Sequence, residues 1–289
     1  MIGSELSVLK RILNYLADNR DRQRIAIALA KGGAMMPMRQ VDLTRPETWE
    51  FSGFSQNGED GIIEVLRRQL NSSNRYFVEI GSAHGVENNS AWLVVAERYE
   101  GLMIEGNARL ADRARRNVAT YSIGTQCQTM FVTVESAATI LNLARYHDPD
   151  VFSLDIDGND YHIARALISG GFRPRIVVVE YNSAYGTERS LSVAYRSDFA
   201  MKSAHPTELY YGVSISGWRR FFEDQGYRFI TVDRNGVNAF FVDPKFFDAS
   251  FLDGICGSNF AENRYQLSKF GVCSDEQFQL IADQNFVPI

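Results

Sequence analysis

The feature that most constrains the fold is an alternation of short apolar runs with helical stretches in the middle of the chain. The apolar runs are rich in β-branched and aromatic residues and lack strict alternation with polar ones, which is typical of parallel strands covered on both faces. They are RYFVEI (75–80), GLMIE (101–105), TMFVTV (129–134), VFSLDI (151–156) and RIVVVEY (175–181). Helical stretches lie between most of them, at residues 88–99, 108–118, 136–146 and 160–169. This order predicts a doubly wound α/β sheet with right-handed crossovers.

The end of the predicted sheet has a different pattern. The segment YRFITVDRNGVNAFFVD (227–243) contains two strands that flank Asn235-Gly236, a dipeptide that accepts positive φ in a tight hairpin turn. Together with the five earlier runs, these two strands make seven, and the last should run antiparallel. A mostly parallel sheet that finishes in such a hairpin resembles class I methyltransferases, whereas dinucleotide-binding domains stay parallel. By this analogy we expect a Rossmann-like, class I methyltransferase fold.

The N-terminal region predicts a helical arm ahead of the main domain. Four leucines repeat at helical spacing, and a second helical segment at 22–31 is expected to end at Gly32-Gly33, where left-handed backbone is unstrained. The four leucines are Leu6, Leu9, Leu13 and Leu16. Residues 35–49 contain two prolines and should form a connecting loop. We therefore expect an arm at 1–50 and a methyltransferase domain at 51–289; the arm either covers that domain or joins a homo-oligomer.

Another helix is expected after Phe54. In FSQNGEDGIIEVLRRQL (54–70), Asn57 and Asp60 have the spacing of a capping box. The apolar residues that follow at helical spacing are Ile62, Ile63, Leu66 and Leu70.

Composition narrows the partners. The net charge is −5 and the basic residues are dispersed, so the chain lacks the basic stripe expected of a nucleic-acid-binding protein. No apolar run approaches the roughly 20 residues of a membrane span, and charges are mixed throughout the N-terminus. Three widely spaced cysteines without a CxxC pair argue against zinc or disulfides and are expected to be packing residues: Cys127, Cys256 and Cys273. We expect a cytoplasmic protein with a small-molecule or glycan partner.

The segment VEIGSAHGVENN (78–89) follows the first strand and predicts a ligand-binding loop. Its glycines, Gly81 and Gly85, allow a ligand to approach the backbone closely, and the following helix presents unpaired amides at its N-terminus. The third glycine of GxGxxG is missing, so a nucleoside fits better than a pyrophosphate. An ordinary βα turn is the alternative.

A second acidic residue supports a nucleoside site. Glu105 ends the strand in GLMIEGN (101–107), at about the distance downstream that suits a carboxylate bound to ribose hydroxyls. Asn107 is placed to assist it. The alternative for Glu105 is an exposed acid at the end of a strand.

Four motifs in order resemble the FkbM-like family of S-adenosylmethionine-dependent O-methyltransferases. They are SQNGEDG (55–61), FVEIGSAHG (77–85), LMIEGN (102–107) and LDIDGND (154–160), and the resemblance covers roughly residues 54–242. It implies S-adenosylmethionine as the cofactor and gives roles to residues of this chain. Glu79 and Gly81 would border the methionine part, Glu105 would hold the ribose, and Gln56 would lie near the same pocket. The other candidates for cofactor binding are Ser82, His84, Asn107 and Asp155. Gly106 departs from the family, where a proline is frequent.

Acidic side chains follow the fourth strand. Alternation along VFSLDID places Ser153, Asp155 and Asp157 on one side as the strand leaves the sheet, whereas Asp160 has the position of an N-cap for the helix at 160–169. The next strand ends in Glu180 and Asn182 at the same carboxyl edge.

Crowded carboxylates repel one another unless a cation lies between them. Asp155, Asp157, Glu180 and Asn182 offer only oxygen ligands of the kind that Mg²⁺, Mn²⁺ or Ca²⁺ prefers. Certain sugar O-methyltransferases of related fold carry metal-binding acids at these strand ends. Alternatively, these acids bind substrate hydroxyls or the adenine amine of the cofactor.

The catalytic candidates are Asp155, Asp157 and His205. A bound cation would make an acceptor hydroxyl more acidic, and His205 lies in the long segment 197–218, where a substrate-covering loop is expected. A solvent-exposed loop histidine is the alternative. Four tyrosines near the same edge are candidates for stacking on an acceptor: Tyr181, Tyr185, Tyr210 and Tyr211.

The sequence as a whole predicts a metal-assisted O-methyltransferase that acts on a hydroxyl of a sugar, a glycan, or a glycosylated or polyketide metabolite. Three alternatives remain: a nucleotide-dependent oxidoreductase, a metal-assisted hydrolase on the same fold, and a non-catalytic carbohydrate-binding module.

Overall fold

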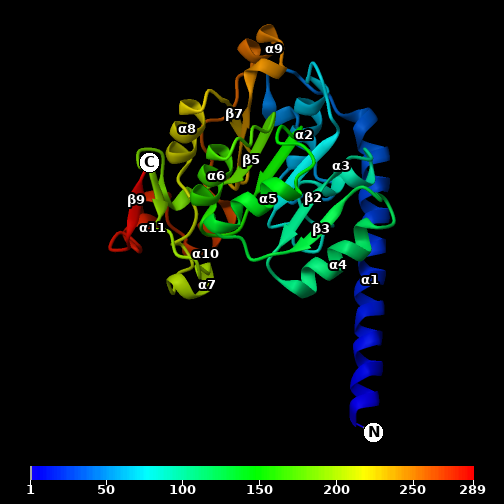
Figure 1. The fold of residues 1–289 in the computed structure, drawn as a ribbon. Helices are drawn as coiled ribbons and strands as arrows, with labels where there is room; N and C mark the ends of the chain where they lie inside the picture. The colour runs from blue at the N-terminus through cyan, green and yellow to red at the C-terminus, as the bar shows by residue number, and fades with distance from the viewer. Residues whose placement is uncertain (1) are drawn as a thin grey trace.

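The computed structural model describes residues 2–289, with side chains from residue 11 onward, and its centre is a seven-stranded sheet (Figure 1). The strands are β1 (Tyr76–Ile80), β2 (Glu100–Glu105), β3 (Gln126–Thr129), β4 (Val151–Leu154), β5 (Ile176–Glu180), β7 (Arg228–Val232) and β8 (Asn238–Val242). Their order is β3-β2-β1-β4-β5-β8-β7, and only β8 runs antiparallel to its neighbours. This is the class I methyltransferase fold with its antiparallel last strand, as predicted.

Helices cover both faces of this sheet, and each face has its own apolar core. On one face lie α5 (Ala137–Leu143), α6 (Asp160–Ser169) and α8 (Ile215–Asp224). The other face packs against α2 (Glu59–Arg68), α3 (Ala91–Val95) and α4 (Ala108–Val118). Alternate residues of one strand, such as Val177 and Val178 of β5, therefore enter different cores, which explains why the predicted strands lack polar alternation.

Smaller elements complete the chain beyond the sheet. They are β6 (Leu191–Val193), α7 (Met201–Ala204), α9 (Ala249–Gly254), α10 (Arg264–Phe270), α11 (Ser274–Gln279) and β9 (Phe286–Pro288), with 3₁₀ helices at Met36–Met38, Pro46–Thr48, Val134–Ser136, Ser183–Tyr185 and Pro244–Phe246. β6 and β9 pair antiparallel. The described residues contain no helix with the length and apolar character needed to cross a membrane.

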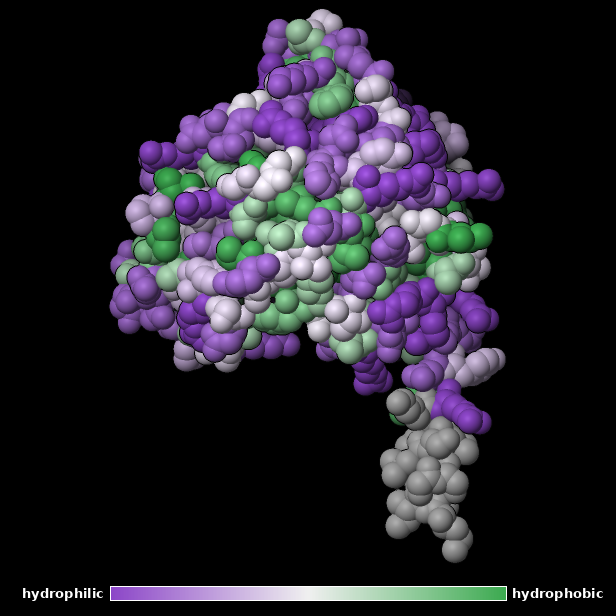
Figure 2. Space-filling model, viewed as in Figure 1, coloured by the Kyte–Doolittle hydropathy of each residue, from purple (hydrophilic) through white to green (hydrophobic). Residues whose placement is uncertain are grey.

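The N-terminal arm is one continuous helix, α1 (Ile2–Met35), which extends well beyond the body (Figure 1). The predicted end at Gly32-Gly33 is wrong, because α1 passes through both glycines. Gly32 is there for packing, since a Cβ atom on it would lie 2.3 Å from the Trp92 ring. Leu13 and Leu16 are about half exposed, whereas the side chains of Leu6 and Leu9 lie outside the described part. On the face seen in Figure 2, apolar side chains of the body show in several separate places among hydrophilic ones.

Two predicted elements are shifted or shortened. β3 ends at Thr129, where the predicted strand began, because this edge strand pairs only with β2 and is polar. The apolar run that follows it leaves the sheet. The helix predicted at 88–99 covers only Ala91–Val95. It does not begin at residue 88, because Asn88, Asn89 and Ser90 bind the Glu79 carboxylate.

Two other local expectations are also corrected. The N-cap of α2 is Gly58 with φ 94°, and Asp60 accepts backbone N–H bonds from residues 53–55, so there is no capping box with Asn57. Cys127 is buried as expected, but Cys256 and Cys273 are exposed and are not packing residues.

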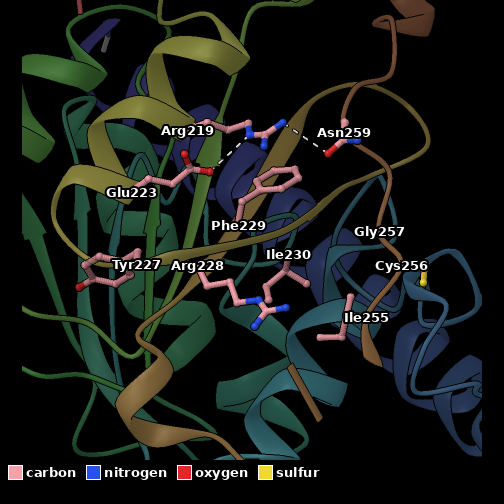
Figure 3. A pocket seen from close by; sticks show the side chains of 10 residues that line it. All are labelled: Arg219, Glu223, Tyr227, Arg228, Phe229, Ile230, Ile255, Cys256, Gly257 and Asn259. Atoms are coloured by element: carbon pink, nitrogen blue, oxygen red, sulfur yellow. Dashed lines mark hydrogen bonds and ion pairs between the residues drawn. The ribbon is translucent and has the colours of Figure 1, made fainter. Parts of the chain in front are cut away.

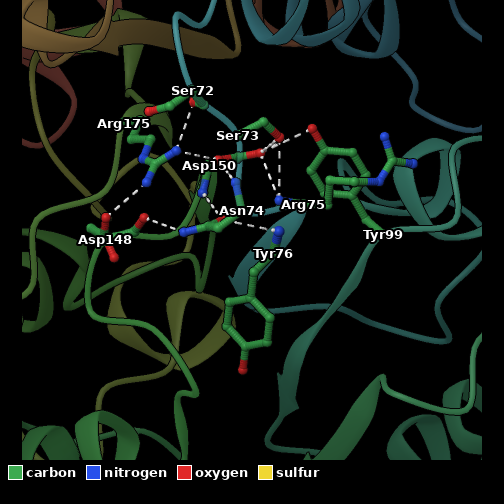
Figure 4. Close-up of polar contacts among 9 residues, drawn as sticks. All are labelled: Ser72, Ser73, Asn74, Arg75, Tyr76, Tyr99, Asp148, Asp150 and Arg175. Carbon is green, nitrogen blue, oxygen red and sulfur yellow. Dashed lines mark hydrogen bonds and ion pairs between the residues drawn. The ribbon is translucent and has the colours of Figure 1, made fainter.

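Asp150 lies at the amino ends of the parallel strands and binds the segments that lead into them, opposite the carboxyl ends of β1 and β4 (Figure 4). It is fully buried immediately before β4. Its carboxylate accepts hydrogen bonds from Ser73 Oγ, the backbone N–H groups of Asn74 and Arg75, Tyr99 Oη and Arg175 Nη1. Five donors to one buried carboxylate tie the chain entering β1 to the chain entering β4 and β5.

Candidate functional site

A cavity of about 690 Å³ opens at the carboxyl ends of β1, β2 and β4. Six residues singled out from the sequence line it: Gln56, Gly81, Glu105, Asn107, Asp155 and Asp157. The apolar run after β3 adds Met130, Phe131 and Val132 to its wall. Ligands of open α/β sheets bind at this edge, so the cavity lies where the fold predicts a ligand site.

Gly81 is required by the close approach of two strand ends. Its φ is 91°, and a Cβ atom on it would lie only 1.7 Å from the backbone oxygen of Asp155. Its N–H donates to Ile104 O at 2.9 Å. The absence of a side chain on Gly81 lets the turn after β1 pack directly against the ends of β2 and β4. The cavity lies beside this turn.

Glu105 connects the loops that follow β1 and β2. Its carboxylate accepts from the Ala83 N–H at 2.9 Å and from the Asn107 N–H at 2.7 Å. The Asn107 side chain caps α4 by accepting from the Arg109 and Leu110 N–H groups. Glu105 faces the cavity, and its oxygens keep lone pairs that can accept from a ligand hydroxyl.

Glu79 lies inside the loop and does not line the cavity, contrary to its predicted contact with the cofactor. Its buried carboxylate accepts from Asn89 N at 2.9 Å, from Asn88 Nδ2 at 2.5 Å and from Ser90 Oγ. Burial raises the pKa of Glu79 to about 7. The residue therefore shapes the loop from within.

Ser82 and His84 also point away from the cavity. Ser82 is buried, and its hydroxyl contacts Ile104 O at 3.4 Å. His84 faces α1, where its Nε2 lies 3.8 Å from Asp21 Oδ1. Neither residue lines the larger cavity, and their binding of the cofactor stays a prediction.

Three carboxylates converge at the ends of the neighbouring strands β4 and β5. Oxygen atoms of Asp155, Asp157 and Glu180 all lie within 4.8 Å of one another. Burial raises the pKa of Asp155 and of Glu180 well above the usual range, and repulsion between the carboxylates raises it further. Glu180 Oε2 is buried without a hydrogen-bond partner. This group of three, which we call the acidic cluster, has the composition of a site for a hard cation.

Asn182 does not join the acidic cluster. Its amide nitrogen donates to Leu209 O and Tyr211 O, and its Oδ1 accepts from Ala184 N at 3.1 Å and from Gln266 Nε2 at 3.4 Å. The side chain is fully buried, so these contacts use its hydrogen-bonding groups within the protein. We therefore remove it from the predicted metal ligands.

Asp160 and His205 have local roles. Asn159 is the N-cap residue of α6, and Asp160, one residue later, accepts from Ile156 N at 3.0 Å and Gly158 N at 2.8 Å. Asp160 therefore holds the turn that carries Asp157. His205 Nδ1 is 2.8 Å from Thr207 Oγ1, and the imidazole lines neither the large cavity nor the smaller one described next.

A second cavity of about 200 Å³ adjoins the acidic cluster. Asp157 lines both cavities, and Glu180 lines the smaller one. Much of the remaining wall comes from α10 and the residue before it: Asn263, Tyr265, Gln266, Lys269 and Phe270. The sequence reasoning missed these residues because they carry no motif and lie outside the region of family resemblance.

Of the four candidate tyrosines, Tyr211 alone lines one of these two cavities. The hydroxyls of Tyr181, Tyr185 and Tyr210 are bound to backbone oxygens. Tyr211 is buried, and its Oη accepts from Gln266 Nε2 at 3.2 Å. Burial and the nearby Glu180 carboxylate raise the pKa of Tyr211, so its hydroxyl stays protonated and can donate.

A separate hollow of about 410 Å³ lies beside the edge strand β7, between α8, β7 and residues 255–259 (Figure 3). Arg219 lies over the Phe229 ring and contacts Glu223 at 3.5 Å and Asn259 Oδ1 at 3.4 Å. Arg228 pairs with Asp253 at 2.7 Å. Both arginines of this hollow thus already have acidic or amide partners within the protein. None of the predicted site residues lines the hollow.

Comparisons with known proteins bear on the fold. No family model matches the chain, and no curated protein matches it. An O-methyltransferase from Bacillus cereus in complex with SAH is 17% identical over 76% of this chain and 89% of that chain, with a TM-score of 0.42. An SAH-bound methyltransferase from Podospora anserina is 15% identical over 74% of this chain and 87% of that chain, with a TM-score of 0.43. The CurJ carbon methyltransferase is 12% identical over 81% and 70%, with a TM-score of 0.43. These likenesses concern the path of the chain and do not identify its reaction.

Proposed function

We propose that this chain is an S-adenosylmethionine-dependent methyltransferase that methylates a hydroxyl oxygen with the help of a divalent cation. The observation that carries the proposal is the position of the acidic cluster between two cavities, with Asp157 lining both. A donor in the larger cavity and an acceptor in the smaller one would meet at these carboxylates. Membership of the FkbM-like family is part of the same proposal and rests on the four motifs.

The larger cavity suits an adenosyl donor. Gly81 leaves room beside the turn after β1, and Glu105 presents carboxylate oxygens to ribose hydroxyls. Gln56 and Asn107 supply amide groups at the rim. When bound, S-adenosylmethionine supplies a methyl group on a positively charged sulfur. The protein's part is to hold that group facing Asp155 and Asp157.

The acidic cluster suits Mg²⁺ or Mn²⁺. Its donors are all oxygens, they lie close together, and Glu180 Oε2 has no hydrogen-bond partner. Asp155, Asp157 and Glu180 would hold the ion, which supplies the positive charge that makes an acceptor hydroxyl more acidic. With His205 outside both cavities, the Asp157 oxygen that does not bind the ion would be the group best placed to accept the hydroxyl proton.

The smaller cavity suits a compact acceptor with several hydroxyl groups. The amides of Asn263 and Gln266, the hydroxyl of Tyr211 and the rings of Tyr265 and Phe270 give it polar and aromatic walls. Such walls favour a sugar ring, free or within a glycoside, because they offer hydrogen bonds together with an aromatic face. This favours the carbohydrate acceptors among those that the sequence predicts.

Calorimetry tests the proposal before the acceptor is known. S-adenosylhomocysteine should bind to the full chain, and Glu105→Ala should weaken binding by about ten- to one-hundredfold, the effect of losing charge-assisted hydrogen bonds. Asp198→Asn is the matched control, because Asp198 is an exposed acid that pairs with Arg196 and lines neither cavity. Mn²⁺ should bind to the wild type and not to Asp155→Asn. Mass spectrometry of sugar glycosides incubated with S-adenosylmethionine and Mn²⁺ should then detect the gain of one methyl group.

The same measurements separate the alternatives. Binding of NAD without S-adenosylhomocysteine would indicate an oxidoreductase, and Mn²⁺ binding without S-adenosylhomocysteine would indicate a hydrolase. Binding of sugars alone would indicate a carbohydrate-binding module. Each of these results would overturn the proposed methyl transfer.

A further inference from the structure

Asp21 is a fully buried carboxylate on α1, the helix on which Ile12, Leu13, Tyr15 and Leu16 are exposed. Arg113 of α4 donates to both of its oxygens, each at 2.5 Å. Asn117 Nδ2 donates to Asp21 Oδ2 at 2.9 Å. Asp21 therefore joins α1 to α4 at a place that solvent does not reach.

The same contacts reach the loop that follows β1. Asn117 Nδ2 also donates to the backbone oxygen of His84 at 2.9 Å. One turn further along α1, Arg24 pairs with Glu87, a residue that lines the larger cavity, and its Nη1 lies 3.4 Å from His84 Nε2. Helix α1 thus contacts the loop from behind at His84 and at Glu87.

This loop needs support from outside its own chain segment. Ala83 has φ 47°, a left-handed conformation that is unfavourable for a residue with a side chain, and Gly85 follows at φ 76°. Glu79 holds the end of the loop through residues 88–90, and apolar packing of Val86 against Ile25 and Ala28 holds its middle. The His84 carbonyl, between the two left-handed residues, is held by Asn117, which Asp21 fixes.

We propose that Asp21 is a positioning residue for the cofactor, and that the anchored half of α1 is a working part of the cofactor site. Asp21 holds Arg113 and Asn117 so that the loop at 81–87 keeps the shape that leaves the larger cavity open. This inference rests on the proposed function, since it assigns an adenosyl ligand to that cavity.

The chain contains a matched control for this proposal. Asp18 lies one turn before Asp21 on α1 and pairs with Arg116 of α4 at 3.2 Å. This ion pair joins the same two helices, but among the described residues Asp18 makes no hydrogen bond or ion pair with the loop. A role limited to holding the helices together would therefore give Asp18 and Asp21 the same kind of effect.

The experiment is titration calorimetry of S-adenosylhomocysteine into the full chain. Asp21→Ala should weaken binding by tenfold or more, whereas Asp18→Ala should stay within twofold of the wild type. Equal affinity of folded Asp21→Ala and wild type would overturn the proposal. If Asp21→Ala does not fold, Arg24→Ala provides the test, because Arg24 is half exposed and its loss should weaken binding by at least threefold.

Hydrogen exchange separates this inference from the proposed function. Without ligand, amides at 81–87 should exchange faster in Asp21→Ala than in Asp18→Ala, while amides of β4 and β5 stay equally protected. Equal exchange at 81–87 in both variants would refute the positioning role even if S-adenosylhomocysteine binds. Failure of the wild type to bind this ligand would instead refute the proposed function.

Discussion

Glu180 has the least favourable surroundings of any carboxylate at the site. It is nine-tenths buried, one of its oxygens lacks a partner, and Asp155 and Asp157 lie beside it. An unpaired buried charge is strongly unfavourable, so without a cation these residues share protons. The cluster is therefore a source of instability in the free protein and, in our proposal, a source of affinity for the ion.

Replacing Asp155 by Asn should raise stability while abolishing methyl transfer. The amide leaves two carboxylates to share protons in place of three and gives Glu180 a hydrogen-bond donor at every pH, a net gain of about 1 kcal/mol in the free energy of unfolding. Urea denaturation without divalent ions would measure it. A less stable variant would contradict our account of the cluster.

Asp150 should respond in the opposite way. Asp150→Asn loses charge-assisted hydrogen bonds in a buried position and leaves Arg175 with a weaker partner. We expect the free energy of unfolding to fall by about 3 kcal/mol, with affinity for S-adenosylhomocysteine unchanged in the folded protein. Denaturation and calorimetry on the same sample would check both. Reduced affinity would mean that the amino ends of the parallel strands are coupled to the site.

At the scale of elements, sequence periodicity predicted the bounds best for strands buried on both faces and for helices with one buried face. The predicted bounds of α4 and α6 match the structure, as does the hairpin of β7 and β8. The edge strand β3 was misplaced because few of its side chains are buried, so its sequence lacks the apolar run that marks a buried strand. The early part of the predicted α3 was wrong because Glu79 competes for the backbone and side chains of residues 88–90.

Two adjacent glycines of α1 should respond to alanine with opposite signs. Gly33→Ala meets no atom within 4 Å and should stabilise the protein by up to about 1 kcal/mol through helix propensity. Gly32→Ala places a methyl group against the buried Trp92 ring and should be destabilising. Thermal unfolding of the two variants side by side would measure the difference. The same sign for both would mean that Trp92 moves aside freely.

At the scale of the whole molecule, three buried carboxylates outside the acidic cluster have raised pKa values. Burial raises the pKa of Asp60, Glu79 and Asp233 to about 7 in each case. Because these values lie above the unfolded value near 4, the folded state holds extra protons between about pH 4 and pH 7. Their contribution to stability is full below that window and is lost as the pH rises through it.

The free energy of unfolding should therefore fall by at least about 2 kcal/mol between pH 5.5 and pH 8 in the absence of divalent ions. Urea denaturation at several pH values would measure this slope. Mn²⁺ at pH 8 should restore part of the stability to the wild type and none to Asp155→Asn. A flat or rising profile would show that these carboxylates are ionised throughout.

The fold was largely predictable, whereas the site was predictable only in part. Asp155, Asp157 and Glu180 lie at the ends of recognisable strands, so topology alone predicts that they meet. The wall formed by Gln266 and Lys269 was not predictable, because it depends on a distant segment that folds back over the sheet edge. The role of Asn182 also depended on contacts that no local pattern records.

The unbroken course of α1 has a mechanical consequence. The part of α1 that extends from the body and the part that contacts His84 and Glu87 belong to one continuous helix. Because a helix is stiff along its axis, we expect the two parts to move together. Binding of a partner to Ile12 or Leu16 would therefore move α1 at Asp21, and with it the loop beside the larger cavity.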